Sequence, residues 1–198
     1  MEMIVLLQLV ILFIVIFDPL SSLVVFLTAS KKAKKKERKK MAMLAIIVAT
    51  TLSFLVILLG NNLLSIFNTT LSEFKIAGGI VLGILGIHMA LGTGATDEIS
   101  KKNHGKAVAA IIGTPLLTGP ATITAILISI NEYGRIVTLI AVSIVLVITA
   151  LLFFLGNFVE KYINNTVVQA LSTILGLVTI AWGVKFITEG IKAIFLLV

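Results

Sequence analysis

The chain has 198 residues, of which 59% are hydrophobic and only 13% charged, and this excludes a soluble globular domain, which carries about a quarter charged residues. The formal net charge of +7 would suit nucleic acid, but eight of the sixteen Lys and Arg residues lie in one segment, 31–40, and we expect no nucleic-acid partner. The absence of cysteine and the presence of only two histidines argue against a metal site, and no cofactor is expected.

Six apolar segments are long enough to cross a bilayer, which takes roughly 20 residues of helix. Their apolar runs are continuous rather than alternating, which favours helices, since a helix satisfies its own backbone in lipid. We therefore expect an all-α membrane protein with a single transmembrane domain over residues 1–198. In chain order, the expected spans are Met3–Ala29, Met41–Gly60, Phe74–Leu91, Ala107–Ile130, Ile136–Phe158 and Val167–Val184.

Asp18-Pro19 interrupts the first span. Asp is a favourable N-cap and proline is favourable as the first helical residue, so the pair predicts a half-helix that starts inside the membrane. A carboxylate at mid-bilayer costs about 2.5–3.5 kcal/mol on insertion scales, which points to a function. Asp18 could hold a substrate ammonium, carry a proton, or only cap the half-helix. The hydroxyls of Ser21 and Ser22 could contact substrate or bond their own backbone.

The basic segment 31–40 follows the first span. Its plain interpretation is a hydrated loop that contacts anionic lipid headgroups, and a regulatory or partner-binding role is the alternative. With six spans, twelve of the sixteen basic residues fall on one side of the membrane. The positive-inside rule then places the loops at 31–40 and 101–106 in the cytoplasm and both termini outside, in a multi-pass protein of the cell membrane.

The third span opens with Ala77-Gly78-Gly79. Gly79 and Gly83 form a face of small residues that would let another helix approach closely. The alternative is that the missing side chains make room for substrate. In the last span, Lys185 and Glu189 are spaced for a helical ion pair with a structural role.

The fourth span contains Thr114-Pro115 and Gly119-Pro120, so a helix can end and restart there. A half-helix start exposes N–H groups and a partial positive charge that favour a carboxylate, and unwound backbone exposes carbonyls that favour an ammonium group. A small zwitterion suits such a site. The candidate substrate-binding residues are Asp18, Pro19, Ser21, Ser22, Gly78, Gly79, Thr114, Pro115, Thr118, Gly119, Pro120, Ala121 and Thr122.

The two halves of the chain resemble each other, which predicts repeats at 1–91 and 107–198 joined by a cytoplasmic linker, 92–106. The matches are Pro19 with Pro120, Leu59-Gly60-Asn61 with Leu155-Gly156-Asn157, and Gly79 and Gly86 with Gly176 and Gly183. Three spans per repeat give the second copy the opposite orientation. We therefore expect two inverted three-helix repeats whose discontinuous spans, the first and the fourth, meet near the midplane.

Three motifs carry a family resemblance: Phe17-Asp18-Pro19, Ala77-Gly78-Gly79 and the stretch 115–122, Pro-Leu-Leu-Thr-Gly-Pro-Ala-Thr. On these the chain resembles the MarC family of membrane proteins, which includes small neutral amino acid transporters. The resemblance implies transport of amino acids such as glycine and alanine, with the amino acid bound at the broken helices. Family members often have a glycine soon after Asp-Pro, where this chain has Leu20-Ser21-Ser22.

The expected function is therefore secondary transport by alternating access, coupled to H⁺ or Na⁺, with Asp18 as the candidate proton carrier. The expected partners are the amino acid, the coupling ion and membrane lipid. No phosphate-binding loop is present, and Asp18 has no evident second intramembrane acid, so we expect no enzyme and no catalytic residues. The alternative is a channel-like pore or an exporter for another small polar solute.

Overall fold

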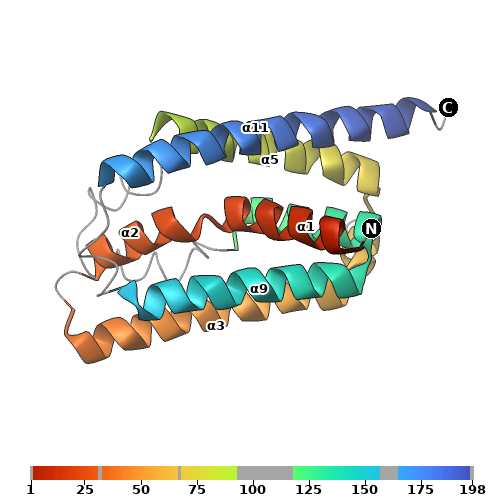
Figure 1. Ribbon diagram of the computed structural model, residues 1–198. Coiled ribbons are helices and arrows are strands. Elements are labelled where there is room, and N and C mark those ends of the chain that lie inside the picture. The colour runs from red at the N-terminus through yellow and green to blue at the C-terminus, as the bar shows by residue number, and fades with distance from the viewer. Residues whose placement is uncertain (1, 31–32, 67, 93–117, 157–164, 197–198) are drawn as a thin grey trace.

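The computed structural model describes residues 2–30, 33–66, 68–92, 118–156 and 165–196. This described part is helical and contains no strand, as the sequence predicts for an all-α protein. Its helices, shown in Figure 1, are α1 (Glu2–Phe17), α2 (Pro19–Ala29), α3 (Lys35–Leu59), α4 (Asn61–Ile66), α5 (Leu71–Leu91), α8 (Pro120–Tyr133), α9 (Arg135–Phe154) and α11 (Asn165–Leu196).

Five stretches of helix are long and apolar enough to cross a membrane: Met3–Leu27, Lys35–Leu59, Leu71–Leu91, Arg135–Phe154 and Thr166–Phe195. Each corresponds to one of the expected spans, and the first contains both α1 and α2. The remaining expected span, Ala107–Ile130, is described only from Thr118 onward, where α8 has 14 residues. Thr114 and Pro115 lie outside the described residues.

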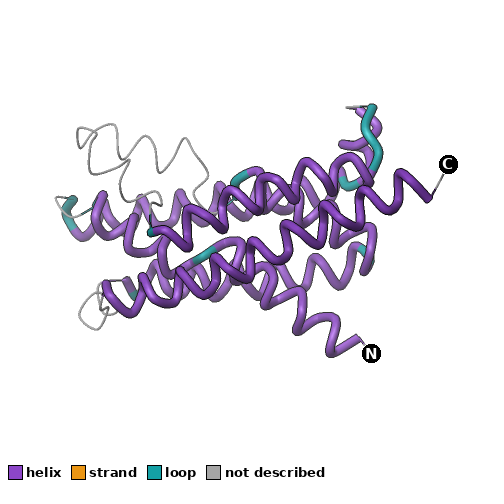
Figure 2. Tube along the Cα trace, turned by 90° about the horizontal axis from the view of Figure 1, so that it is seen from above, coloured by secondary structure: helices purple, strands orange, loops and turns teal. Residues whose placement is uncertain are grey.

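The long helices lie roughly along one direction and stack as three layers in Figure 1. The layer of α5 and α11 lies at the top, α1 and α2 lie in the middle with α8, and α3 and α9 lie at the bottom; the tube in Figure 2 shows the same elongated bundle from above. Side chains that are 0–1% exposed, such as Phe13, Phe17 and Ile126, form the core between the layers. Met3, Leu58 and Ile136 are each at least two-thirds exposed, as expected for a surface that lipid covers.

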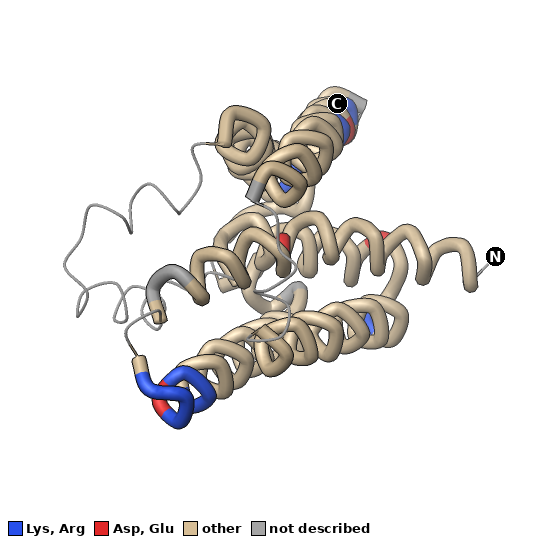
Figure 3. The backbone as a smooth tube through the Cα atoms, turned by 60° about the vertical axis from the view of Figure 1, so that its left-hand side comes forward, with Lys and Arg blue, Asp and Glu red and all other residues tan. Residues whose placement is uncertain are grey.

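The helix α3 begins inside the basic segment, which corrects the expectation of a loop over the whole of 31–40. Lys and Arg are good helix formers, and Glu37 in the first turn accepts a hydrogen bond from the Lys34 backbone N–H at 3.0 Å. The basic residues from Lys35 onward therefore lie on a helix. Figure 3 shows them gathered at its start, and Figure 1 places this start at the opposite end of the bundle from both chain termini.

Glycines bring α5 and α11 into backbone contact. A Cβ atom added at Gly79 would lie 2.5 Å from the Gly183 carbonyl oxygen, and one added at Gly86 would lie 2.6 Å from that of Gly176. Gly83, expected on the same face, also lies against α11, because a Cβ added at Gly183 would lie 2.9 Å from its backbone N; a Cβ added at Gly83 itself meets nothing within 4 Å among the described residues. The contact thus repeats every seven residues, close to two helical turns, as in helices that pack nearly antiparallel.

Gly86→Ala is expected to lower the stability of the protein by roughly 1–3 kcal/mol, because the new methyl group forces two backbones apart. Gly83→Ala is the matched control on the same helix, and it should be neutral or gain up to about 1 kcal/mol from the better helix propensity of alanine. Thermal unfolding of both variants in detergent micelles measures the difference. Equal shifts in the same direction would contradict the close approach.

A cluster of charges joins three helices at the end of the bundle where the chain begins and ends. Lys75 of α5 forms ion pairs with Glu132 of α8 and, at 3.0 Å, with Glu189 of α11. Lys185 lies 3.6 Å from Glu189, which confirms the expected helical pair. The sequence did not predict the part played by Lys75, because its partners lie 57 and 114 residues away.

Candidate functional site

The first candidate feature is the junction between α1 and α2 at Asp18. Pro19 has no N–H group to continue the helix, and the backbone of Asp18 turns into the left-handed region with φ of +38°. Asp visits this region more readily than most residues. The junction remains hydrogen-bonded, with Asp18 N donating to the Ile14 carbonyl at 3.1 Å and Ser22 N donating to the Asp18 carbonyl at 3.0 Å.

The side chain of Asp18 caps α2, as the sequence predicts. Its Oδ1 accepts a hydrogen bond from the Ser21 backbone N–H at 3.3 Å. Ser22 is 5% exposed, and its hydroxyl donates to the Phe17 carbonyl at 3.3 Å. For Ser22 the backbone alternative is therefore confirmed, whereas capping leaves Asp18 with further carboxylate lone pairs, since a carboxylate accepts about four hydrogen bonds.

The second candidate feature is the start of α8. Gly119 is its N-cap residue and Pro120 its first helical residue, so no side chain caps this helix. The Gly119 carbonyl accepts hydrogen bonds from Thr122 N at 3.0 Å and Ile123 N at 3.2 Å. Among the described residues, a Cβ added at Gly119 would meet nothing within 4 Å, so no described atom fills the space beside the helix start.

Thr118 lies next to this space. Its side chain is 1% exposed, yet within the described part of the chain its hydroxyl has no hydrogen-bond partner. A buried hydroxyl without a partner costs about 1–3 kcal/mol in proteins, and such a group in a native structure calls for an explanation. A ligand that supplies the missing partner is one explanation.

The two features lie at about the same level along the bundle, away from either end, in Figure 1. Helix α1 also packs directly against α8. The starts of α2 and α8 differ in one respect that the match between the two halves of the sequence does not reveal. The start of α2 is capped by a carboxylate of the chain itself, whereas the start of α8 carries a glycine and has no side-chain cap.

The other candidate residues take packing positions. Ala121 and Thr122 are buried in the first turn of α8. A Cβ added at Gly78 would lie 1.8 Å from Cγ2 of Thr124, so this glycine lets α5 approach α8. Gly79 contacts α11, as described above. The described structure thus has other helices, not open space, beside Gly78 and Gly79.

Comparison with known proteins identifies the family. The model of the MarC family of integral membrane proteins matches residues 3–195, which is nearly the whole chain. This chain belongs to the MarC family. Together with the five apolar helices, membership in this family makes it a multi-pass membrane protein.

Several curated proteins of the same kind are similar to this MarC chain. UPF0056 membrane protein PH0214 of Pyrococcus horikoshii is 32% identical over 134 residues, which cover 68% of this chain and 66% of that protein. UPF0056 membrane protein YhcE of Escherichia coli is 29% identical over 147 residues, covering 69% and 68%. The matches thus span about two thirds of these relatives, and their names state no substrate. No solved structure matches the chain.

Proposed function

We propose that this protein is a secondary transporter that carries small neutral amino acids, such as glycine and alanine, across the cell membrane. One observation carries the proposal: the start of α8 has no side-chain cap, and among the described residues nothing fills the space at Gly119 and nothing pairs with the buried hydroxyl of Thr118. This helix start lies at about the level of the junction between α1 and α2 (Figure 1). The start of α8 favours a negative group and the carboxylate of Asp18 favours a positive one, and both lie inside the bundle of membrane helices.

The substrate carboxylate would bind at the start of α8, where helix N–H groups and the helix dipole favour an anion. There the Thr118 hydroxyl would gain its missing partner. The substrate ammonium would face Asp18, whose carboxylate keeps acceptor sites beyond the one that Ser21 uses. Because the space at position 119 lies directly beside the helix backbone, a substrate with a small side chain would fit best.

The architecture proposed for this transporter is a pair of inverted repeats, 1–91 and 107–198, with six spans. The contacts between α5 and α11 support it. Gly79 meets Gly183, and Gly86 meets Gly176, although the sequence repeat equates Gly79 with Gly176 and Gly86 with Gly183. Such reciprocal contact, in which each residue meets the counterpart of the other, is what a twofold axis produces.

The remaining layers fit the same relation. The sequence repeat makes α3 and α9 counterparts, and these two helices pack together. It makes α8 the counterpart of α2, since Pro120 matches Pro19, so the contact of α8 with α1 joins the second half of one proposed discontinuous span to the first half of the other. In an inverted repeat the two discontinuous spans approach each other near the midplane, and rocking one repeat against the other exposes the site to each side in turn. The Lys75 cluster would then hold α5, α8 and α11 together at one end.

The proposed orientation places the start of α3 in the cytoplasm and both termini outside, with Asp18 as the candidate carrier of a coupling proton or Na⁺. The basic residues gather at the end of the bundle opposite both termini, which supports this orientation under the positive-inside rule.

Counterflow tests transport directly. Liposomes that contain the purified protein and are loaded with unlabelled glycine or alanine are expected to take up labelled substrate transiently and saturably. A pore does not exchange one labelled molecule for another, so this readout also separates the carrier from the channel-like alternative. Absence of glycine and alanine flux under H⁺, Na⁺ and substrate gradients alike would overturn the proposal.

Thr118→Val is expected to change stability and binding in opposite directions. Valine has the shape of threonine without the hydroxyl, so the empty protein should gain about 1 kcal/mol when an unpaired polar group is removed. Glycine should bind about tenfold more weakly, because it loses one hydrogen bond to its charged carboxylate. Thermal unfolding with and without glycine measures both effects, and unchanged glycine binding would remove Thr118 from the site.

A further inference from the structure

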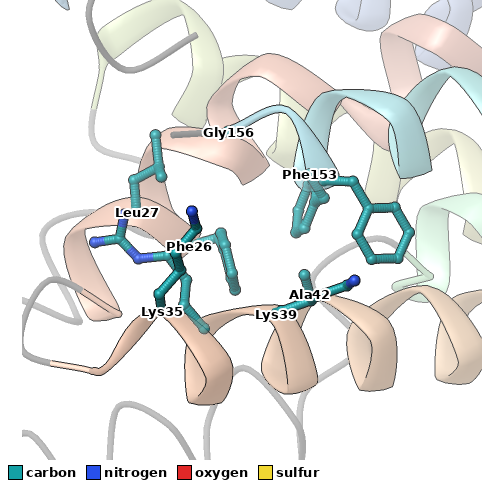
Figure 4. Close-up of a pocket in the computed structure, with 9 residues that line it drawn as sticks. Phe26, Leu27, Lys35, Lys39, Ala42, Phe153 and Gly156 are labelled. Carbon is teal, nitrogen blue, oxygen red and sulfur yellow. The ribbon is translucent and has the colours of Figure 1, made fainter. Parts of the chain in front are cut away.

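A cavity of about 370 Å³ lies at the end of the bundle that carries the basic residues, well away from the start of α8. It lies between the end of α2, the start of α3 and the end of α9 (Figure 4). Nothing in the proposed transport site accounts for it. Its walls are of two chemical kinds, one cationic and one apolar.

The cationic wall belongs to α3. Lys35, Arg38 and Lys39 line the cavity together, because residues three and four apart share one face of a helix. Arg38 is held near the end of α2, where its Nη2 donates to the Ser30 carbonyl at 3.4 Å. Glu37, the acidic residue of this segment, caps α3 through the Lys34 N–H and is not among the described residues that line the cavity.

The apolar wall belongs to α2 and α9. The rings of Phe26 and Phe153 stack with their centroids 5.0 Å apart and are 1% and 4% exposed. Phe154 is 43% exposed at the mouth of the cavity. In the view of Figure 4, Phe26 and Phe153 lie on opposite sides of the space, and Lys35 and Lys39 of α3 lie along its lower edge. A ligand in this cavity therefore meets positive charge and aromatic surface at once.

We propose that this cavity binds an anionic phospholipid, with the phosphate between Lys35 and Lys39 and the first carbons of an acyl chain against the phenylalanine rings. The cavity lies where the apolar part of α3 gives way to its basic turns, which is the level of lipid headgroups. Basic pockets between membrane helices on the cytoplasmic side are known to hold such headgroups. The apolar wall favours a lipid over free phosphate, which has nothing to place there.

The test compares two double variants of the purified full-length protein in detergent. Lys35→Gln with Lys39→Gln removes the lysines of the cavity, whereas Lys36→Gln with Lys40→Gln removes the same charge from the same turns of α3 at positions that do not line it. Arg38 is kept in both. The amount of bound phosphatidylglycerol, measured by native mass spectrometry during titration, gives the affinity. Phosphatidylcholine, whose zwitterionic headgroup has no net charge, is the comparison lipid.

Each basic residue near an anionic headgroup contributes roughly fivefold in affinity, so the cavity pair should bind phosphatidylglycerol roughly thirtyfold more weakly than wild type. The control pair should stay close to wild type. Equal losses in the two pairs would overturn the proposal, because they would indicate diffuse attraction to the whole basic segment. Equal binding of phosphatidylglycerol and phosphatidylcholine by the wild-type protein would also overturn it, even if a variant failed to fold.

Two further measurements separate a lipid from a phosphate source. Glycerol phosphate and inorganic phosphate, titrated alone, are expected to compete only weakly, and full displacement of the lipid by either would assign the cavity to a free phosphate. Phe154→Ala, which keeps every positive charge, should weaken lipid binding without changing the binding of glycerol phosphate. These titrations need no amino acid, so their failure would leave the transport proposal untouched, and the reverse also holds.

Discussion

Gly119→Asp is expected to abolish glycine and alanine transport while the protein remains folded. Aspartate is a favoured N-cap residue, and a φ of −74° at this position accepts any side chain. The new carboxylate would occupy the start of α8, as that of Asp18 occupies the start of α2. A substrate carboxylate would then meet a like charge, which costs several kcal/mol and should weaken binding by at least about a hundredfold.

The matched control is Gly119→Ala, which adds only a methyl group that meets no described atom and should keep a measurable part of glycine binding. Stabilisation by glycine in thermal unfolding and counterflow in liposomes measure the two variants side by side. Wild-type transport by Gly119→Asp would show that the start of α8 does not receive the substrate. A folded Gly119→Asp protein that lost transport would instead support the site, because misfolding could not explain the loss.

Asp18→Asn is expected to raise the glycine concentration needed for half-maximal counterflow by at least about thirtyfold. The amide cannot match the charge of the substrate ammonium, and loss of one partner of a buried charged pair costs roughly 2–5 kcal/mol. The protein should still fold, because asparagine also caps helices and tolerates a positive φ. If Asp18 carries the coupling proton, the variant should also lose uptake driven by a pH gradient.

Ser22→Ala is the control for this experiment, since it removes a neighbouring hydroxyl that is already bound to the Phe17 carbonyl and keeps the Ser21 backbone N–H whose hydrogen bond Asp18 accepts. Its counterflow should stay near wild type. An Asp18→Asn protein with an unchanged half-saturation concentration and an unchanged response to a pH gradient would mean that Asp18 only caps α2.

The difference between the two helix starts gives the proposed site a direction. At α2 the chain supplies its own carboxylate, and at α8 it leaves the equivalent place to glycine. In a site of this kind one end attracts a positive group and the other a negative group. A zwitterion therefore fits in one orientation, whereas a simple cation or anion would satisfy only half of the site.

Local chemistry explains what could be predicted from the sequence. Five apolar helices, the junction at Asp18-Pro19 and the capping role of Asp18 depend on residues close together in the chain, namely runs of apolar side chains and a proline without an N–H group. The pair Lys185–Glu189 is predictable for the same reason, since its members lie four residues apart.

Other features depended on packing between distant segments. The sequence predicts Gly79 and Gly83 on one helix face, and both lie against α11. Only the register of α5 against α11 decides that an added Cβ would clash at Gly79 and Gly86 but not at Gly83. Hydropathy could not reveal this, because lipid is as apolar as a protein core and a membrane helix is apolar on every face. Charge density does not predict that α3 starts inside the basic segment, because Lys and Arg suit a hydrated loop and a helix alike.

By itself, the sequence determined that this protein is a helical membrane protein of the MarC kind with an acidic break in its first span, because apolar runs and proline act within a few turns of helix. Only the tertiary structure decided which polar groups remain unsatisfied and which charges meet. Several features arise between segments that are far apart in the chain. They are the partners of Lys75, the two-walled cavity and, among the described residues, the unpaired hydroxyl of Thr118 and the unfilled space at Gly119. Burial and pairing depend on which residues are neighbours in space, and the order of residues along the chain does not reveal these neighbours.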